Sequence, residues 1–164
     1  MDKELLHGKY GGTPRIRVCG ILVEGNSVLL IKHRGLGSQG ELWLPPGGGV
    51  EFGDTAEDSL KREFLEETGL KIEICDFLFV SEFLMKPLHA MELFFSVKSI
   101  GGKLAKGKDP EFKAHQQIID EVKMMDYSEI NSLGRECLHG ILRTCNSTEE
   151  LLNTHGFFNF ENNP

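Results

Sequence analysis

Three glutamates lie close together in the segment WLPPGGGVEFGDTAEDSLKREFLEETGL, which runs from Trp43 to Leu70. Glu63, Glu66 and Glu67 have the spacing i, i+3 and i+4, which places three carboxylates on one face of a helix. Like charges at this spacing destabilise an isolated helix by roughly 0.2–0.5 kcal/mol per pair. The cluster therefore indicates a bound multivalent cation, and hard ions such as Mg²⁺ and Mn²⁺ prefer oxygen ligands of this kind.

The residues around these glutamates predict a helix with defined ends. Asp54 or Thr55 can cap its N-terminus, and Asp54 with Glu57 has the spacing of a capping box. Gly69 suits the left-handed conformation of a C-terminal cap. One flank of the helix carries an apolar stripe formed by Ala56, Leu60 and Phe64. This stripe would dock the helix on a sheet while the glutamates face a cleft.

A run of three glycines, residues 47–49, comes just before this helix. Glycine lets the backbone approach a ligand closely, so the position of the run favours a binding loop over an ordinary turn. Glu51 lies in the same loop and either hydrogen-bonds a ligand or supports the turn. We expect Trp43, ahead of the loop, to pack in the core rather than to form a base-stacking platform.

The segment resembles the signature of the Nudix hydrolases, G-x5-E-x7-R-E-U-x-E-E-x-G-U, where U is a bulky apolar residue. The matching residues are Gly48, Asp54, Arg62, Glu63, Phe64, Glu66, Glu67, Gly69 and Leu70. Asp54 departs from the pattern, which usually has Glu there, and we expect this change to affect capping or local support before it affects metal binding. The resemblance implies an α/β fold, an α/β/α sandwich with a central mixed β-sheet.

The same resemblance implies Mg²⁺- or Mn²⁺-dependent hydrolysis of a pyrophosphate bond. Its expected substrate is a nucleoside diphosphate linked to another moiety: a nucleotide sugar, ADP-ribose or a modified nucleoside triphosphate. The expected metal ligands are the carbonyl of Gly47 and the side chains of Glu63, Glu66, Glu67 and Glu121. Arg62, Glu63 and Glu67 are the expected catalytic residues. Arg62 would orient a carboxylate, and Glu63 would either bind metal or abstract a proton.

Candidates outside the signature rest on weaker patterns. Glu121 begins an apolar strand, where family members often place a further carboxylate, and Asp120, Glu111 and His115 compete with it for that role. A basic residue often meets phosphate in the family near the end of the second strand. We therefore take Arg34 as a substrate-binding residue, together with Glu51.

Length and charge limit the classes of protein that the chain can represent. Its 164 residues suit one domain, and a net charge of −7 argues against a protein that holds long nucleic acid by neutralising phosphates. The four cysteines form no C-x2-C pair, so free thiols in a reducing compartment are expected rather than a zinc site. The sequence shows neither an apolar signal core nor a long apolar run, so we expect a cytoplasmic protein without membrane contact.

The predicted organisation is a flexible lead (1–14), a Nudix hydrolase domain (15–145) and a tail without assigned structure (146–164). Strands are predicted at 15–23, 27–33, 41–44, 71–84, 89–100 and 116–125. A helix with a break near Gly134 or Gly140 is predicted at 127–145, Pro87 is expected to interrupt a strand pair, and 101–113 is expected to be a loop. The family resemblance allows a homodimer. The alternative function is an inactive Nudix-like module that binds a nucleotide or a partner.

Overall fold

The computed structural model describes residues 11–85, 88–107 and 117–160. Its strands are β1 (Arg15–Glu24), β2 (Ser27–Arg34), β3 (Glu41–Leu44), β4 (Gly47–Gly49), β5 (Leu70–Met85), β6 (Leu88–Gly102), β7 (Ile119–Asp126) and β8 (Gly156–Phe158). Its helices are α2 (Ala56–Thr68), α3 (Tyr127–Ile130), the 3₁₀ turn η2 (Arg135–Cys137), α4 (Gly140–Thr144) and α5 (Thr148–Leu152). No helix within these described ranges is long and apolar enough to span a lipid bilayer.

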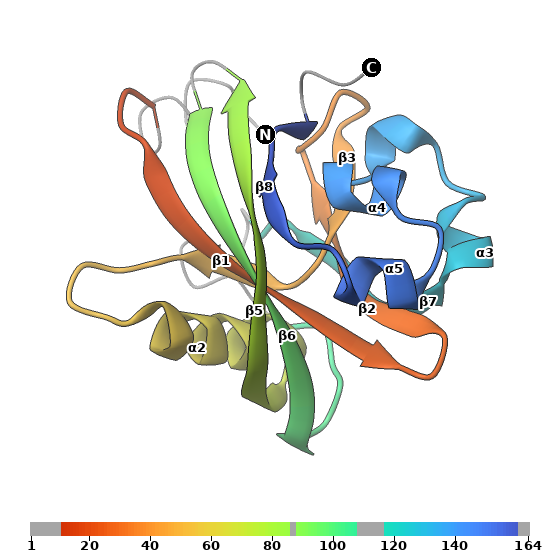
Figure 1. Ribbon diagram of the computed structural model, residues 1–164, viewed down its shortest axis with the longest axis horizontal. Helices are drawn as coiled ribbons and strands as arrows, with labels where there is room; N and C mark the ends of the chain where they lie inside the picture. The colour runs from red at the N-terminus through yellow and green to blue at the C-terminus, as the bar shows by residue number, and fades with distance from the viewer. Residues whose placement is uncertain (1–10, 86–87, 108–116, 161–164) are drawn as a thin grey trace.

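The strands form one mixed sheet with the order β3-β2-β1-β6-β5-β8 (Figure 1). β1 pairs with β6 and β5 pairs with β8 in parallel, whereas the other pairs are antiparallel. The short strand β4 adds to β1, and β7 adds to β2. Helices cover both faces of the sheet, so the predicted α/β/α sandwich with a central mixed sheet is confirmed.

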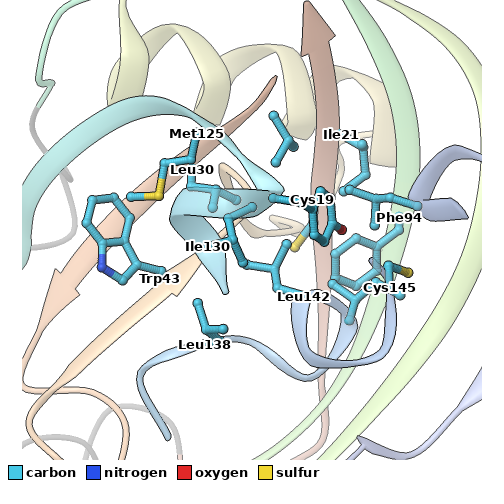
Figure 2. Close-up of a cluster of buried hydrophobic side chains, with 14 of the residues drawn as sticks. Cys19, Ile21, Leu30, Trp43, Phe94, Met125, Ile130, Leu138, Leu142 and Cys145 are labelled. Carbon is cyan, nitrogen blue, oxygen red and sulfur yellow. The ribbon is translucent and has the colours of Figure 1, made fainter. Parts of the chain in front are cut away.

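Alternate side chains of β1 enter two different cores. Val18 and Leu22 pack with α2, whereas Cys19 and Ile21 pack with α3, α4 and α5 on the other face. Figure 2 shows the second core, which extends from Trp43 across the sheet towards β6. Trp43 is 4% exposed and packs in this core, as predicted. Period-two alternation therefore puts neighbouring residues of one strand on opposite sides of the sheet.

Helix α2 has the ends and the apolar face that its sequence predicts. Thr55 is its N-cap, and its Oγ1 accepts a hydrogen bond from the Asp58 N–H at 3.1 Å. Gly69 ends the helix in the left-handed conformation, with φ at 72°. Phe64 is fully buried against Gly20 of β1, where an added Cβ would lie only 2.5 Å from the ring. The absence of a side chain at this glycine lets α2 lie close to the sheet.

Two segments differ from the prediction or go beyond it. The predicted helical segment at 127–145 is broken near Gly134 and Gly140, as expected, into α3, η2 and α4, but less of it is helical than predicted, because the chain between α3 and α4 contacts β3. There Leu138 forms an isolated parallel bridge with Trp43, and the His139 N–H donates to the Trp43 carbonyl at 2.8 Å. The tail, which had no assigned structure, forms α5 and then β8 at the edge of the sheet. Pro87 lies outside the described residues.

Candidate functional site

The glycine loop is held against β1 because it forms β4. Gly47 pairs with Cys19 and Gly48 pairs with Val18. Gly47 has φ at 153°, and a Cβ there would lie 2.0 Å from the Val18 carbonyl oxygen. A Cβ on Gly48 would lie 2.2 Å from Cδ of Glu63. Both positions therefore require glycine, one for contact with β1 and one for contact with α2.

Glu67 is fixed by the glycine loop. The Gly47 N–H donates a hydrogen bond to Glu67 Oε2 at 2.8 Å. Glu67 is buried, with only 2% of the residue exposed. His33 of β2 lies on the other side, with Nε2 at 3.7 Å from Glu67 Oε1. Neither ring nitrogen of His33 has a hydrogen-bond partner among the described residues. The loop thus fixes one oxygen of Glu67 and leaves the other facing a buried imidazole.

Glu63 lies under the loop, one helical turn before Glu67, and is 6% exposed. Burial raises its pKa from 4.5 to about 7, and the nearby charge of Glu67 acts in the same direction. Arg62 opposes this rise through a contact of 2.9 Å between its Nη1 and Glu63 Oε1. Glu63 can therefore gain or lose a proton near neutral pH, which suits a group that takes part in proton transfer.

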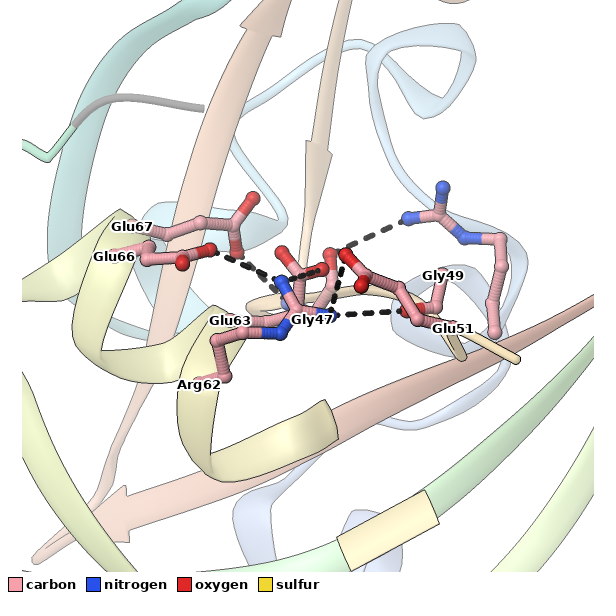
Figure 3. Close-up of polar contacts among 8 residues, drawn as sticks. Gly47, Gly49, Glu51, Arg62, Glu63, Glu66 and Glu67 are labelled. Carbon is pink, nitrogen blue, oxygen red and sulfur yellow. Dashed lines mark hydrogen bonds and ion pairs between the residues drawn. The ribbon is translucent and has the colours of Figure 1, made fainter. Parts of the chain in front are cut away.

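Arg62 lies among the acidic side chains (Figure 3). Its Nη1 is 2.9 Å from Glu63 and 3.2 Å from Glu66 Oε2. Its Nη2 donates to the Gly49 carbonyl at 3.4 Å and lies 3.6 Å from Glu51 Oε1. One guanidinium thus connects the helix to the loop and provides positive charge for two of the three glutamates. The mutual repulsion that the sequence suggested is relieved in part by this residue, so it does not by itself require a bound ion.

The oxygen atoms of the site are still ligands of the type that a hard divalent ion prefers. They are the carboxylate oxygens of Glu63, Glu66 and Glu67 and the backbone carbonyl of Gly47, which accepts a hydrogen bond from Arg17 Nη2 at 3.4 Å. Mg²⁺ and Mn²⁺ bind such oxygens. Within the described ranges, however, no three His, Cys, Asp or Glu side chains converge closely enough to hold an ion together. Arg62 holds two of these carboxylates and the Gly47 N–H holds the third. An ion would therefore compete with Arg62 for the carboxylate oxygens, and it would share the Gly47 carbonyl, which has two lone pairs, with Arg17.

Two predicted site residues lie elsewhere. Glu121 is exposed and lies opposite Lys32 in the β2–β7 ladder, while its neighbour Val122 packs with the core beside α2. Side chains alternate along a strand, so Glu121 is on the face away from α2. Arg34 is 71% exposed as a side chain and forms an ion pair with Asp120. The structure does not bring either residue to the acidic cluster. Glu111 and His115 lie outside the described residues.

A second buried charged group was not predicted. Arg17, Glu92 and His139 come from β1, β6 and the turn before α4, and they meet next to Gly47. A charged residue inside an apolar strand was the available signal for Arg17 and Glu92, since charged side chains are rarely buried without a partner. His139 gave no comparable signal, although it lies next to Gly140, one of the two positions where a break in the helix was predicted.

Two hollows lie around α5, with volumes of about 550 and 640 Å³. Both include Asn153 and His155, and one is also lined by Cys75 and Asp76 of β5. In the described part of the chain, neither hollow is lined by a residue of α2 or of the glycine loop. The candidate site is therefore defined by its charged groups and the glycine loop rather than by a large hollow.

Known sequences and structures are similar to this chain over much of its length. The sequence profile of the NUDIX domain matches residues 13–143. An ADP-ribose pyrophosphatase of Methanocaldococcus jannaschii is 37% identical over 98 residues, which make up 58% of this chain and 57% of that protein. An oxidized purine nucleoside triphosphate hydrolase of Mus musculus is 40% identical over 62 residues, 37% of this chain and 38% of that protein. The chain thus spans little more than half of the first relative's length.

A solved NUDIX hydrolase from Nitrosomonas europaea has a similar fold. It superposes with a TM-score of 0.70 over 87% of this chain and 93% of that chain, at 16% sequence identity. At this identity the likeness concerns the fold.

Proposed function

This chain belongs to the NUDIX domain family, and from that premise we propose that it hydrolyses the pyrophosphate bond of a nucleoside diphosphate linked to another moiety. One observation carries the proposal. The glycine loop is bound to Glu67 and packed on Glu63, so backbone and carboxylates meet at one place beside α2. Loops of this kind let a polyphosphate chain approach the protein closely.

We assign the charged residues to steps of this reaction. Pyrophosphate resists attack because its oxygens repel a nucleophile, and a bound Mg²⁺ or Mn²⁺ would spread that charge and lower the pKa of a water molecule. Glu66, Glu67 and the Gly47 carbonyl would hold the ion. Glu63 would either join them or accept the proton of the attacking water, and its raised pKa supports the second role. Arg62 would orient Glu63, because it already contacts that carboxylate.

For the substrate, we propose a small nucleoside diphosphate derivative such as ADP-ribose or a nucleotide sugar. The relative from Methanocaldococcus jannaschii is named as an ADP-ribose pyrophosphatase, which supports testing this compound first. The relative from Mus musculus is named as a hydrolase of oxidized purine nucleoside triphosphates, so modified triphosphates belong in the same test. The net charge of −7 fits a small ligand that arrives with cations better than a long nucleic acid.

The test is a substrate panel with Mg²⁺ or Mn²⁺, in which products are identified by mass spectrometry in ¹⁸O-labelled water. We expect a nucleoside monophosphate and a phosphorylated partner, and the label shows which phosphorus is attacked. Glu67→Gln should reduce turnover by about 100-fold or more. Glu57→Gln is the matched control, because this glutamate lies on the same helix but its side chain is 61% exposed.

Two results would contradict the proposal. The first is a wild-type protein that releases no phosphate-containing product from the panel, which would favour the binding-module alternative. The second is a Glu67→Gln variant that is as active as the Glu57→Gln control, which would place the chemistry elsewhere.

A further inference from the structure

Arg17, Glu92 and His139 form a continuous network on the sheet face away from α2, in which Glu92 and His139 are buried and the Arg17 side chain is half-buried. His139 Nε2 lies 2.9 Å from Glu92 Oε2, and Arg17 Nε lies 3.5 Å from Glu92 Oε1. Arg17 Nη2 then donates to the Gly47 carbonyl at 3.4 Å. The network therefore connects the turn before α4 with the glycine loop, through residues that are far apart in sequence.

The position of His139 in this network is fixed at several atoms. Its Nδ1 accepts a hydrogen bond from the Ile141 N–H at 3.3 Å, so the ring proton is on Nε2 and is donated to Glu92. Its backbone N–H donates to the Trp43 carbonyl at 2.8 Å. The segment that runs from Trp43 to Gly47 is thus held at both ends, by the main chain of His139 and by Arg17.

Glu92 is ionised within this network. It is 6% exposed, and although burial disfavours its charged form, His139 and then Arg17 hold its pKa below 4.5. A buried ion pair is poor evidence for a gain in stability, since apolar residues of similar volume often stabilise a protein equally well. The contact with Gly47 gives the network a second role to consider.

We propose that Arg17, Glu92 and His139 are positioning residues that fix the Gly47 carbonyl and thereby hold the glycine loop in place over Glu63 and Glu67. This inference rests on the proposed function, because it assigns the loop to the hydrolytic site. The geometry explains the arrangement: Gly47 receives Arg17 on its carbonyl and donates its N–H to Glu67. A shift of this one residue therefore changes the support of the acidic cluster directly.

The test compares Arg17→Met with the double variant Arg17→Met/Glu92→Gln. The single variant leaves Glu92 without its cation and can fold poorly, whereas the double variant removes both charges and still lets residue 92 accept the His139 proton. Lys98→Met is the control, because it removes a cation from the exposed Glu73–Lys98 pair on the neighbouring ladder.

Four measurements are made on each variant: the melting temperature, the binding of Mn²⁺ followed by electron paramagnetic resonance, hydrogen exchange of the peptide spanning residues 43–50 in metal-free protein, and steady-state kinetics. We expect the double variant to regain most of the wild-type melting temperature. We also expect it to bind Mn²⁺ about tenfold more weakly and to exchange the loop amides about tenfold faster. Its kcat should fall more than its KM changes, since the loop is displaced rather than the substrate contacts removed.

The proposal is overturned if the double variant recovers wild-type loop exchange and Mn²⁺ affinity together with its stability, because the network would then be structural. Loop exchange needs neither metal nor substrate, so it decides the question even if the protein proves inactive. A panel without turnover in wild type would contradict the proposed function alone. Wild-type activity that Glu67→Gln abolishes and the double variant retains would contradict only the positioning role.

Discussion

Replacing Glu63 by glutamine should make the metal-free protein more stable at alkaline pH. The pKa of this carboxyl rises from 4.5 to about 7 in the folded chain, which corresponds to about 3 kcal/mol of free energy of unfolding. The folded state binds this proton more tightly than the unfolded state does. The stability that the proton confers is therefore complete below about pH 4.5 and is lost as the pH rises through about 7.

For a chain of this size, about 3 kcal/mol corresponds to roughly 6–12 °C in melting temperature. Glu63→Gln is always neutral, so it should melt at nearly the wild-type temperature at about pH 4 and up to that amount higher at about pH 8. The assay is differential scanning calorimetry in EDTA from about pH 4 to about pH 8. Other groups titrate in this range, so the informative quantity is the difference between the two proteins at each pH.

Parallel melting curves for wild type and Glu63→Gln across this range would refute the reasoning. They would show that Glu63 is solvated or paired well enough to keep an ordinary pKa. Glu57→Gln, at a side chain that is 61% exposed on the same helix, is measured alongside as the matched control.

Three further predictions concern the loop and the helix. Gly48→Ala should lower turnover by about tenfold or more in steady-state assays, because the new Cβ would meet the Glu63 carboxylate. Phe64→Ala should lower the free energy of unfolding in urea by about 3–5 kcal/mol, since the ring is fully buried between α2 and β1. A loss below about 1 kcal/mol would contradict this packing. Arg62→Ala should raise the pKa of Glu63 further, as measured by NMR titration of the carboxyl carbon in metal-free protein, because the guanidinium now lowers it. An unchanged pKa would show that Arg62 and Glu66 form a separate surface pair.

The helix and its acidic face were predictable because all their determinants are local. The cap at Thr55, the stripe with Phe64 and the end at Gly69 lie within one segment, and each uses spacing that the backbone geometry of a helix dictates. The same holds for the glycine loop, whose position follows from the residues on either side. The resemblance to the Nudix signature covers this local segment, and the strands that flank it have simple apolar patterns.

The second charged network could not be predicted in the same way. Arg17 and Glu92 become neighbours only through the parallel pairing of β1 with β6, and His139 reaches them only because the chain leaves its helical course to meet Trp43. The strand pairing has no local signature, and Gly134 and Gly140 predict only that the helix breaks, not that the chain then meets Trp43. For Glu121 the sequence suggested a contact that the fold does not make. Its position at the start of a strand suggested a place beside the glutamates, whereas strand alternation puts its side chain on the face of the sheet away from α2.

The pairing of β8 with β5 has a consequence for biosynthesis. It joins Phe79–Ser81 to Gly156–Phe158, and a nearby contact between Leu78 and His155 closes a loop of 77 residues. During translation, β5 leaves the ribosome well before its partner, so its edge is open to other chains for several seconds. A stop codon after Cys145 would make this exposure permanent, and the truncated product should aggregate even though every acid of the candidate site is present.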